Sequence, residues 1–322
     1  MESWLEKVKL KLPKGVNQYR VKREAKEFIL RILTAILLIG ISYTILAPVI
    51  GMFSTAFMSV EDLFNPMVFL IPSAPTFDNF RGAVQHLRFW NTLAFTLGYS
   101  VGLSLLHVLV ASFVGYGFAR YKFRGSNVIF AIVLLTFIIP PQAYMVPLWF
   151  RFRFFGPTNV NLIDSYASII ILTLAGMGLR SGLFIYICRQ FFRGLPVEIS
   201  EAAKIDGCGH LRTYTSVMMP NAKPAIITVF MFALVWHYGD TFFSGLLLTR
   251  PQFMHVSLGQ VVFRWMTYNS RGGSMMFADF EMMQAQMVFL AGVTLVIAPI
   301  ILIYAIIQRQ FIEGIERSGI VG

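Results

Sequence analysis

The chain has 322 residues, of which 56% are hydrophobic, 15% are aromatic and only 13% are charged. A soluble domain ordinarily carries about 25% charged residues, so this composition excludes an ordinary water-surrounded globule. Several apolar stretches reach the roughly 20 residues that a helix needs to cross a bilayer. They are continuously apolar rather than alternating, which excludes a β-barrel and predicts an all-α integral membrane protein.

A basic segment, residues 1–27, precedes the first apolar run. The sequence leaves open whether this segment is an amphipathic surface helix or a disordered tail. The run that follows is too long for the core of a signal peptide, so we expect an uncleaved membrane helix. A domain of six spans is expected over residues 28–307, with the spans at Phe28–Met52, Thr92–Tyr116, Val128–Phe150, Tyr166–Phe191, Pro224–Phe243 and Gln284–Ile307.

Lysine and arginine accumulate in the cytoplasmic loops of membrane proteins. With the N-terminus inside, the inner segments hold 19 of these residues and the outer loops hold 7. This bias predicts that both termini are cytoplasmic, including a tail at residues 308–322. It also accounts for the net charge of +11, which therefore predicts attraction to anionic lipid rather than a nucleic-acid partner.

A polar insertion at residues 189–224 separates the fourth and fifth spans on the predicted cytoplasmic side. Pro196 suits the first position of a helix, and acidic residues in the first turns favour the helix dipole. Gly207 can adopt the left-handed conformation that ends a helix. These signals predict a helix from Pro196 up to Gly207. A second short helix is expected over Leu211–Met218, ended by Pro220.

The first of these helices has features that suit contact with another protein. The small side chains of Ala202 and Ala203 would permit close approach, and Glu201 and Asp206 would supply directional polar contacts. Such a helix could lock two subunits together and transmit rigid-body motion between them. Taken from the residues alone, a simple loop that connects two spans is the more economical interpretation.

The spacing of the residues in this loop favours the subunit-contacting helix over a simple connecting loop. Glu201-Ala202-Ala203, then Gly207, then Val217-x-Met219-Pro220 resembles the EAA motif of permeases in ATP-binding-cassette (ABC) importers. Three more positions extend the match: Asp206, Tyr214 and Pro224. The departures from the motif are conservative and fall at Cys208, Val217 and Met219.

The resemblance extends over about residues 28–322. The approach sequence Phe191–Pro196, the segments Ile139–Pro141 and Asn161–Asp164, and the C-terminal Gln310–Gly322 look like those of carbohydrate importers. Together they are most similar to the second permease subunit of maltose-type systems. The resemblance implies the six-helix type I importer permease fold in a bacterial cell membrane.

The resemblance also implies a set of partners and coupling residues. The partners are a second homologous permease, two ATPase subunits, an extracytoplasmic solute-binding protein and a sugar substrate. ATP and Mg²⁺ would be bound by the ATPases, and this chain lacks the Gly-x-x-x-x-Gly-Lys-[Ser/Thr] loop that cradles phosphates, so we expect neither hydrolysis nor a cofactor in it. The residues that would engage the ATPase are Glu198, Glu201, Ala202, Ala203, Lys204, Asp206, Gly207, Arg212 and Pro220.

Charged side chains inside membrane spans are costly, by roughly 2.5–3.5 kcal/mol at the centre of a helix, and so indicate candidates for function. Arg180 lies inside the expected fourth span, where it would contact a sugar or form a structural pair with an acidic residue or helix-end carbonyls. Four further candidates for the substrate path follow in the fifth span: Trp236, His237, Tyr238 and Asp240. Interface anchoring and ordinary packing are the competing interpretation of these four.

Two other function classes stay open at this point. An intramembrane enzyme would use His237, Asp240 and Arg180, although these form no convincing catalytic set, and the histidines lack metal-ligand spacing. A secondary transporter would be expected to show an internal repeat, and none is apparent. His107 in the second span is expected to make an interhelical hydrogen bond, and Cys188 and Cys208 are expected to be free thiols.

Overall fold

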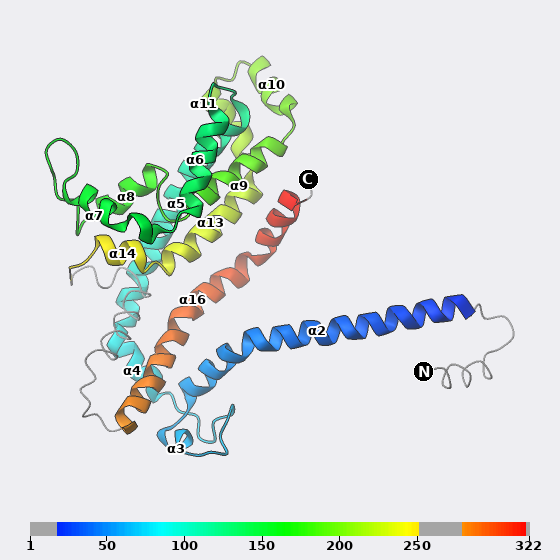
Figure 1. The fold of residues 1–322 in the computed structure, drawn as a ribbon, viewed down its shortest axis with the longest axis vertical. Coiled ribbons are helices and arrows are strands. Elements are labelled where there is room, and N and C mark those ends of the chain that lie inside the picture. The colour runs from blue at the N-terminus through cyan, green and yellow to red at the C-terminus, as the bar shows by residue number, and fades with distance from the viewer. Residues whose placement is uncertain (1–17, 251–278, 320–322) are drawn as a thin grey trace. The chain divides into compact units, whose positions relative to one another are not determined.

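The computed structural model describes residues 18–250 and 279–319, which are helical apart from connecting segments and one isolated bridge between Phe155 and Val160 (Figure 1). The chain divides into two compact units, Met1–Ala74 and Pro75–Gly322. The helices are α2 Gln18–Phe57, α3 Val60–Leu63, α4 Asp78–Leu87, α5 Phe89–Arg120, α6 Ser126–Ile138, η1 Pro141–Tyr144, α7 Met145–Arg153, α8 Tyr166–Leu174, α9 Ser181–Gly194, α10 Val197–Ile205, α11 His210–Arg212, η2 Thr213–Met218, α12 Met219–Asn221, α13 Lys223–Tyr238, α14 Phe242–Leu247 and α16 Asp279–Gly319.

The first unit consists of the long helix α2, the short helix α3 and the loop after it. The Ser59 side chain caps α3 by accepting a hydrogen bond from the Asp62 backbone N–H at 3.2 Å. The buried Asp62 carboxylate accepts hydrogen bonds from the backbone N–H groups of Ser73, at 3.2 Å, and Ala74, at 3.3 Å. These bonds fold the loop back onto α3.

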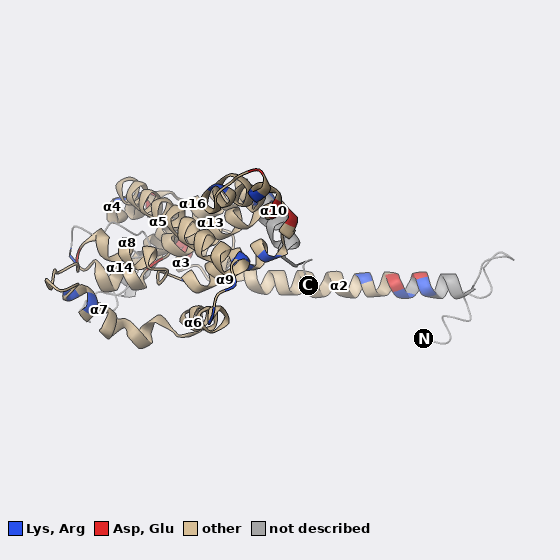
Figure 2. Cartoon of the chain, turned by 90° about the horizontal axis from the view of Figure 1, so that it is seen from above, with Lys and Arg blue, Asp and Glu red and all other residues tan. Residues whose placement is uncertain are grey.

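The second unit is built around the helices α5, α9 and α13. Helix α5 packs against both α9 and α13, while α6 packs on α9, and α16 packs on α13 and α4. Charged side chains gather at the end that carries α10 and at the end that carries α7, and mostly uncharged helices lie between them (Figure 2). This separation of charge is the pattern expected of a protein that lies across a bilayer.

Two glycines allow the helices of this bundle to approach closely. A Cβ on Gly115 of α5 would lie 2.7 Å from Cys188 Cβ and 2.9 Å from the Arg189 backbone N, both on α9. A Cβ on Gly182 of α9 would lie 2.6 Å from the Val133 carbonyl oxygen of α6. In a membrane the hydrophobic effect does not drive helices together. Small residues at a crossing let the two backbones come into van der Waals contact, and this packing stabilises the helix pair.

The first, second and sixth expected spans each lie within one long helix, namely α2, α5 and α16. The stretches apolar enough to cross a membrane are Lys26–Phe57, Phe89–Arg120 and Ala285–Arg309, and two bent helix pairs bring the number to at most five in the described part of the chain. The total of six spans and the cytoplasmic position of both termini stay predictions. Residues 1–17 and 320–322, which belong to the two predicted tails, lie outside the described residues.

The third expected span is not one continuous helix. Helix α6 ends at Ile138, and the helical stretch from Pro141 to Arg153 that follows is bent away from it by 101°. Ile139 has extended backbone (φ −67°, ψ 122°) because it precedes Pro140, whose ring disfavours helical geometry in the residue before it. The expected span Val128–Phe150 is therefore corrected to a broken helix.

The fourth expected span, Tyr166–Phe191, is also broken. Helix α8 ends at Leu174, and α9 begins at Ser181. Between them Gly176 has φ +70° and Arg180 has φ +60°, both in the left-handed region that interrupts a helix. Arg180 therefore lies at the break, as the N-cap of α9, and not inside a helix as its sequence position suggested.

The fifth expected span and the helix before it also need correction. Helix α13 ends at Tyr238, earlier than the expected Phe243, because the chain turns at Gly239 and starts α14. The helix expected to stop before Pro220 instead continues through it to Asn221, by way of the π-helical turn η2. Pro220 occupies the first turn of α12, where a missing N–H is tolerated.

The crossing of α5 and α9 gives a stability prediction. We expect Gly115→Ala to destabilise the protein by about 1–3 kcal/mol, because the added methyl group forces the two backbones apart. Thermal unfolding in detergent measures the effect as a lower midpoint temperature. The matched control is Gly102→Ala on the same helix, where an added Cβ meets nothing within 4 Å. Equal midpoints for the two variants would contradict the close crossing.

Candidate functional site

Helix α10 forms where the sequence indicates, although it begins one residue after Pro196 and ends at Ile205. Pro196 is its N-cap and Glu198 lies in its first turn. At its end Gly207 has φ +79°, and the N–H groups of Gly207 and Cys208 donate to the carbonyl oxygens of Lys204 and Ala203 at 3.0 and 2.9 Å. This pair of bonds is a Schellman motif, which ends the helix and satisfies its last carbonyls.

One face of α10 is open and the other packs on its own chain. The side chains on the open face are those of Glu198, Glu201, Ala202, Lys204 and Asp206, and Ile205 is 86% exposed beside them. Ala203, by contrast, is only 5% exposed. The expectation that both alanines permit approach by another protein is therefore corrected, because only Ala202 faces outward in this chain.

The end of α5 holds the chain on both sides of α10. The Arg120 guanidinium donates hydrogen bonds to the carbonyl oxygens of Leu195, at 2.8 Å, and Pro196, at 3.3 Å, just before the helix. The Tyr121 hydroxyl lies 3.0 Å from His210 Nδ1, just after the helix. Helix α10 is thus fixed at both ends to a helix of the bundle.

The turn η2 adds a third attachment to α5. The Tyr214 hydroxyl is 2.7 Å from Ser112 Oγ, and the Tyr214 ring lies 5.1 Å from the ring of Tyr116. Tyr214 is 6% exposed, whereas Arg212 is exposed beside it. The aromatic position of the EAA-like motif therefore packs inside the chain, while the open face of α10 stays accessible.

The five substrate-path candidates do not form one cluster. Residues that follow one another on α13 point about 100° apart, so they enter different contacts. Trp236 is 40% exposed and lies under Arg180, whose Cζ is 4.6 Å from the ring centroid. Tyr238 donates to the Val296 carbonyl oxygen of α16 at 2.7 Å. The Asp240 carboxylate accepts bonds from three backbone N–H groups of α14, those of Phe242, Phe243 and Ser244.

His237 joins a buried polar network in the centre of the bundle. Its Nε2 is 2.8 Å from His107 Nδ1, and His107 Nε2 is 2.7 Å from Ser181 Oγ. The two histidines are 1–2% exposed and come from α5 and α13, with Ser181 from α9. The expected interhelical hydrogen bond of His107 is confirmed. The Asp240 carboxylate instead accepts bonds from α14, and the Asp240 backbone N–H reaches His237, donating to its carbonyl oxygen at 3.3 Å.

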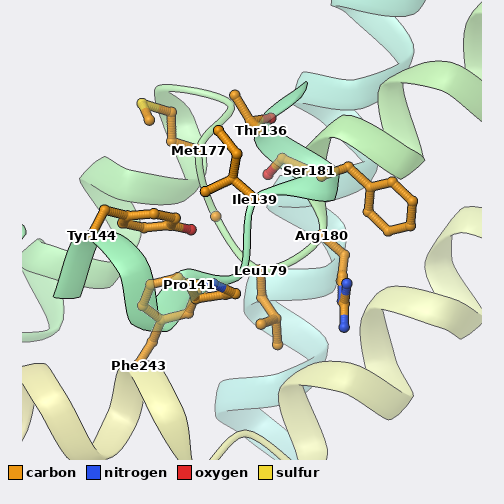
Figure 3. Close-up of a pocket in the computed structure, with 11 residues that line it drawn as sticks. Thr136, Ile139, Pro141, Tyr144, Met177, Leu179, Arg180, Ser181 and Phe243 are labelled. Atoms are coloured by element: carbon orange, nitrogen blue, oxygen red, sulfur yellow. The ribbon is translucent and has the colours of Figure 1, made fainter. Parts of the chain in front are cut away.

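A cavity of about 240 Å³ opens at the breaks in the third and fourth spans (Figure 3). Its walls come from the end of α6, from η1 and from the segment that joins α8 to α9. The lining side chains are mostly apolar, with hydroxyl groups at Thr136, Tyr144 and Ser181. Arg180 also lines the cavity and supplies its cationic group. Non-helical backbone is tolerated at membrane depth where it lines such a space.

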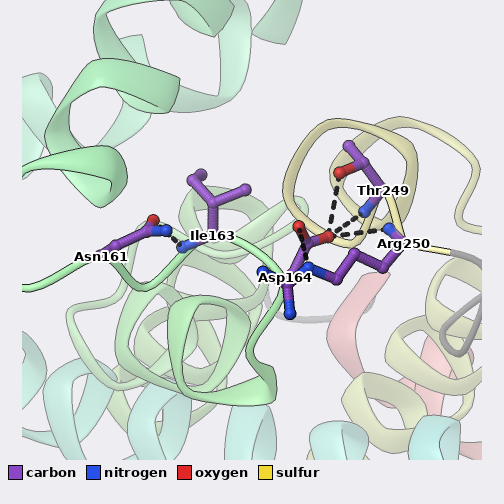
Figure 4. A network of polar contacts seen from close by, with 5 residues as sticks. All are labelled: Asn161, Ile163, Asp164, Thr249 and Arg250. Carbon is purple, nitrogen blue, oxygen red and sulfur yellow. Dashed lines mark hydrogen bonds and ion pairs between the residues drawn. The ribbon is translucent and has the colours of Figure 1, made fainter.

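A clasp lies between the loop that precedes α8 and the end of α14 (Figure 4). The Asp164 carboxylate accepts hydrogen bonds from the Thr249 N–H at 2.5 Å, the Thr249 hydroxyl at 2.9 Å and the Arg250 N–H at 2.9 Å. The Arg250 Nε is 3.4 Å from the same carboxylate. Burial raises the pKa of Asp164, but these bonds outweigh it, so the pKa lies below its ordinary value.

The sequence could not indicate several residues that build these sites. Arg120 and Tyr121 lie far along the chain from α10, and Phe137, whose ring centroid is 5.4 Å from the Arg180 guanidinium, lies on another helix. Each looks like an ordinary interface or core residue in the sequence. Only the close α5–α9 and α6–α9 crossings bring them to these positions.

Apolar helices, a cavity at their breaks and an exposed, anchored polar helix define the membrane component of a transport system. A family model described as "binding-protein-dependent transport system inner membrane component" matches residues 107–317. The chain belongs to this family. It is a multi-pass membrane protein and the permease component of an ABC transporter.

Individual relatives are similar over most of the chain. A probable ABC transporter permease of Pyrococcus horikoshii is 28% identical over 86% of this chain and 92% of its own length. The arabinooligosaccharide permease AraQ of Halalkalibacterium halodurans is 25% identical, over 90% and 98%. The maltodextrin permease MdxG of Bacillus subtilis is 24% identical, over 77% and 81%.

A solved structure shares the fold. It is a chain of a bacterial ABC transporter involved in the import of the acidic polysaccharide alginate, with a TM-score of 0.71 and 23% identity. The match covers 89% of this chain and 98% of that chain. The expected importer permease fold is thereby confirmed.

The hydrogen bonds of Arg120 predict how firmly α10 is held. We expect Arg120→Ala to accelerate tryptic cleavage after Lys204 severalfold, because the start of α10 then opens more often. Limited trypsin digestion of the purified protein, followed by mass spectrometry, measures the rate. Arg124→Ala on the adjacent loop is the matched control and is expected to leave the rate unchanged. Equal rates for both variants and the wild type would contradict the attachment.

The clasp predicts a dependence on pH. Because the Asp164 pKa is lowered in the folded chain, the clasp stabilises the fold above the ordinary pKa of 3.8 and is lost as the pH falls through the lowered value. At neutral pH we expect Asp164→Ala to raise the hydrogen exchange of the Thr249 and Arg250 amides about tenfold. Wild-type protein should behave like the variant only at the lower pH, after correction for intrinsic exchange.

Figure 4 offers the control for this experiment. Asn161 on the same loop accepts a hydrogen bond from the Ile163 N–H at 3.0 Å and makes no bond to the other side of the clasp. Asn161→Ala should therefore leave the exchange of Thr249 and Arg250 at the wild-type rate. An Asp164→Ala variant with wild-type exchange at these two amides would show that the clasp does not hold them.

Proposed function

We propose that this permease imports a sugar or oligosaccharide into a bacterial cell. Support for a saccharide comes from relatives named for maltodextrin and arabinooligosaccharide transport, which are similar over most of their length. The solute would arrive on an extracytoplasmic binding protein, as the family description suggests. It would then pass between this chain and a second, homologous permease in the cell membrane.

The observation that carries the proposal is the open face of α10. Two ATPase subunits bind ATP and Mg²⁺ in the cytoplasm, and one of them receives this face in a groove. Glu198, Glu201, Ala202 and Lys204 supply the contacts, with Asp206, Gly207 and Arg212 at the end of the contact region. Ala203 is buried and contributes by packing α10 on its own chain, whereas the exposed Pro220 lies just after η2 and supplies a further contact. Hydrolysis is left to the partners.

Motion would pass from α10 to the bundle through α5. When ATP closes the two ATPases, the two coupling helices move together, and Arg120 and Tyr121 transmit this movement to α5. The spans then open toward the binding protein. The solute biases this equilibrium only through its different affinity for the two states of the permease.

Two variants, one in α10 and one just after it, test the coupling role. We expect Glu201→Lys and Gly207→Pro each to lower ATP-dependent uptake of radiolabelled maltodextrins and arabino-oligosaccharides at least tenfold. Glu201→Lys reverses the charge on the open face, and proline cannot adopt the φ of +79° found at Gly207. Uptake into cells that express the complete system is the measurement, with membrane insertion checked by immunoblot.

The matched control is Gln190→Lys, which adds a positive charge at an exposed position of α9, outside α10. It should transport normally. Purification of the tagged wild-type chain should also recover an ATPase and a second permease. Normal uptake by Glu201→Lys and Gly207→Pro, or purification of the chain without an ATPase, would overturn the proposal.

A further inference from the structure

Arg180 has no carboxylate partner in the part of the chain that the structure describes. The ion pairs found there join other residues, and the Arg180 guanidinium instead lies against two aromatic rings, those of Trp236 at 4.6 Å and Phe137 at 5.4 Å. Cation–π contacts of this kind hold a guanidinium in place without neutralising its charge. Placing a positive charge inside a membrane costs free energy, and contact with an anion or with water lowers this cost.

The backbone at Arg180 is held in an unusual conformation. A non-glycine residue in the left-handed region costs on the order of 1–3 kcal/mol, and such residues persist where the surrounding structure holds them. Arg180 has φ +60° and is the N-cap of α9. Ser181, the first residue of that helix, is fixed by its hydrogen bond to His107. The break therefore presents the arginine in a defined position.

The cavity beside Arg180 has the composition of a small-molecule site. Apolar side chains of Ile139, Pro141 and Leu179 line it, with the Tyr144 hydroxyl beside them (Figure 3). The Thr136 hydroxyl also lines it and donates to the Val133 carbonyl oxygen at 2.7 Å. Ligand pockets are lined mostly by apolar and aromatic side chains with a few polar groups that set orientation. Its volume of about 240 Å³ is below the ~300–1,000 Å³ of drug-sized pockets, which suits one ring at a time.

We propose that Arg180 and this cavity form a subsite for a sugar ring that carries a carboxylate, such as a uronic acid. The apolar face of the ring lies against the cavity walls, and its carboxylate accepts charge-assisted hydrogen bonds from the Arg180 guanidinium, which the Trp236 and Phe137 rings hold in place. The fork of N–H donors on arginine matches the two oxygens of a carboxylate. This inference rests on the proposed function, and it names the class of solute.

The test measures binding to the assembled transporter, with trigalacturonate as the acidic probe and maltotriose as the neutral one. Isothermal titration calorimetry is carried out on the permease–ATPase complex in nanodiscs, without a binding protein. We expect the wild type to bind trigalacturonate more tightly than maltotriose, and more weakly at high salt. Arg180→Gln should weaken trigalacturonate binding at least tenfold and change maltotriose binding less than twofold.

Two further variants separate the charge of Arg180 from a general effect of removing an arginine. Arg180→Lys keeps the charge but loses the fork, so it should retain part of the preference for trigalacturonate. Arg153→Gln removes another arginine that stacks on a phenylalanine ring, 5.8 Å from the Phe154 centroid, but it does not line the cavity. It should bind both probes as the wild type does.

Four results would overturn the subsite: no trigalacturonate binding by the wild type, equal affinity for the two probes, an unchanged Arg180→Gln, or an Arg180→Gln chain that no longer assembles with its partner permease. The last would assign Arg180 to a pair across the permease interface. Failure of the proposed function is distinguishable, since it appears as a missing ATPase or as normal uptake by Glu201→Lys, whatever the binding results.

Discussion

The bonds between Arg120 and the chain just before α10 are the link on which the proposed coupling depends. An exposed helix of nine residues has little stability of its own, because most helical stability in proteins comes from packing. Here the guanidinium of α5 holds the start of α10, Tyr121 holds the chain after it, and Tyr214 packs η2 against the same helix. A partner that moves α10 therefore moves α5.

The third and fourth spans are interrupted, and the backbone groups at these interruptions need hydrogen-bond partners. A bilayer offers no water to satisfy backbone N–H and C=O groups, so an interruption must be surrounded by protein or line a polar space. The break before α9 meets this demand with the His107–Ser181 hydrogen bond on one side and the cavity on the other. The interruptions therefore provide the permease with an internal space that continuous helices would have filled.

Local signals explain what could be predicted from the sequence. The start of α10 at Pro196 and its end at Gly207 follow from residues that act within one turn, so both could be predicted, as could the long helices α2, α5 and α16. The break at Arg180 could not be predicted, because a hydropathy average over many residues does not detect one residue with a left-handed φ. The contact of Arg180 with Trp236 depends on how α9 packs beside α13, which no local pattern encodes.

Helix α5, unlike the third and fourth spans, is one continuous helix. It runs without a break for 32 residues, from beside α4 to the residues that hold α10 (Figure 1). At a rise of about 1.5 Å per residue it is a stiff rod about 48 Å long, and tilting such a rod by about 5° at one end displaces the other by about 4 Å. This displacement is close to half of the ~8–10 Å that separates the axes of two packed helices. A small rotation at the end that holds α10 is thus enough to separate or close a helix contact at the opposite end of α5.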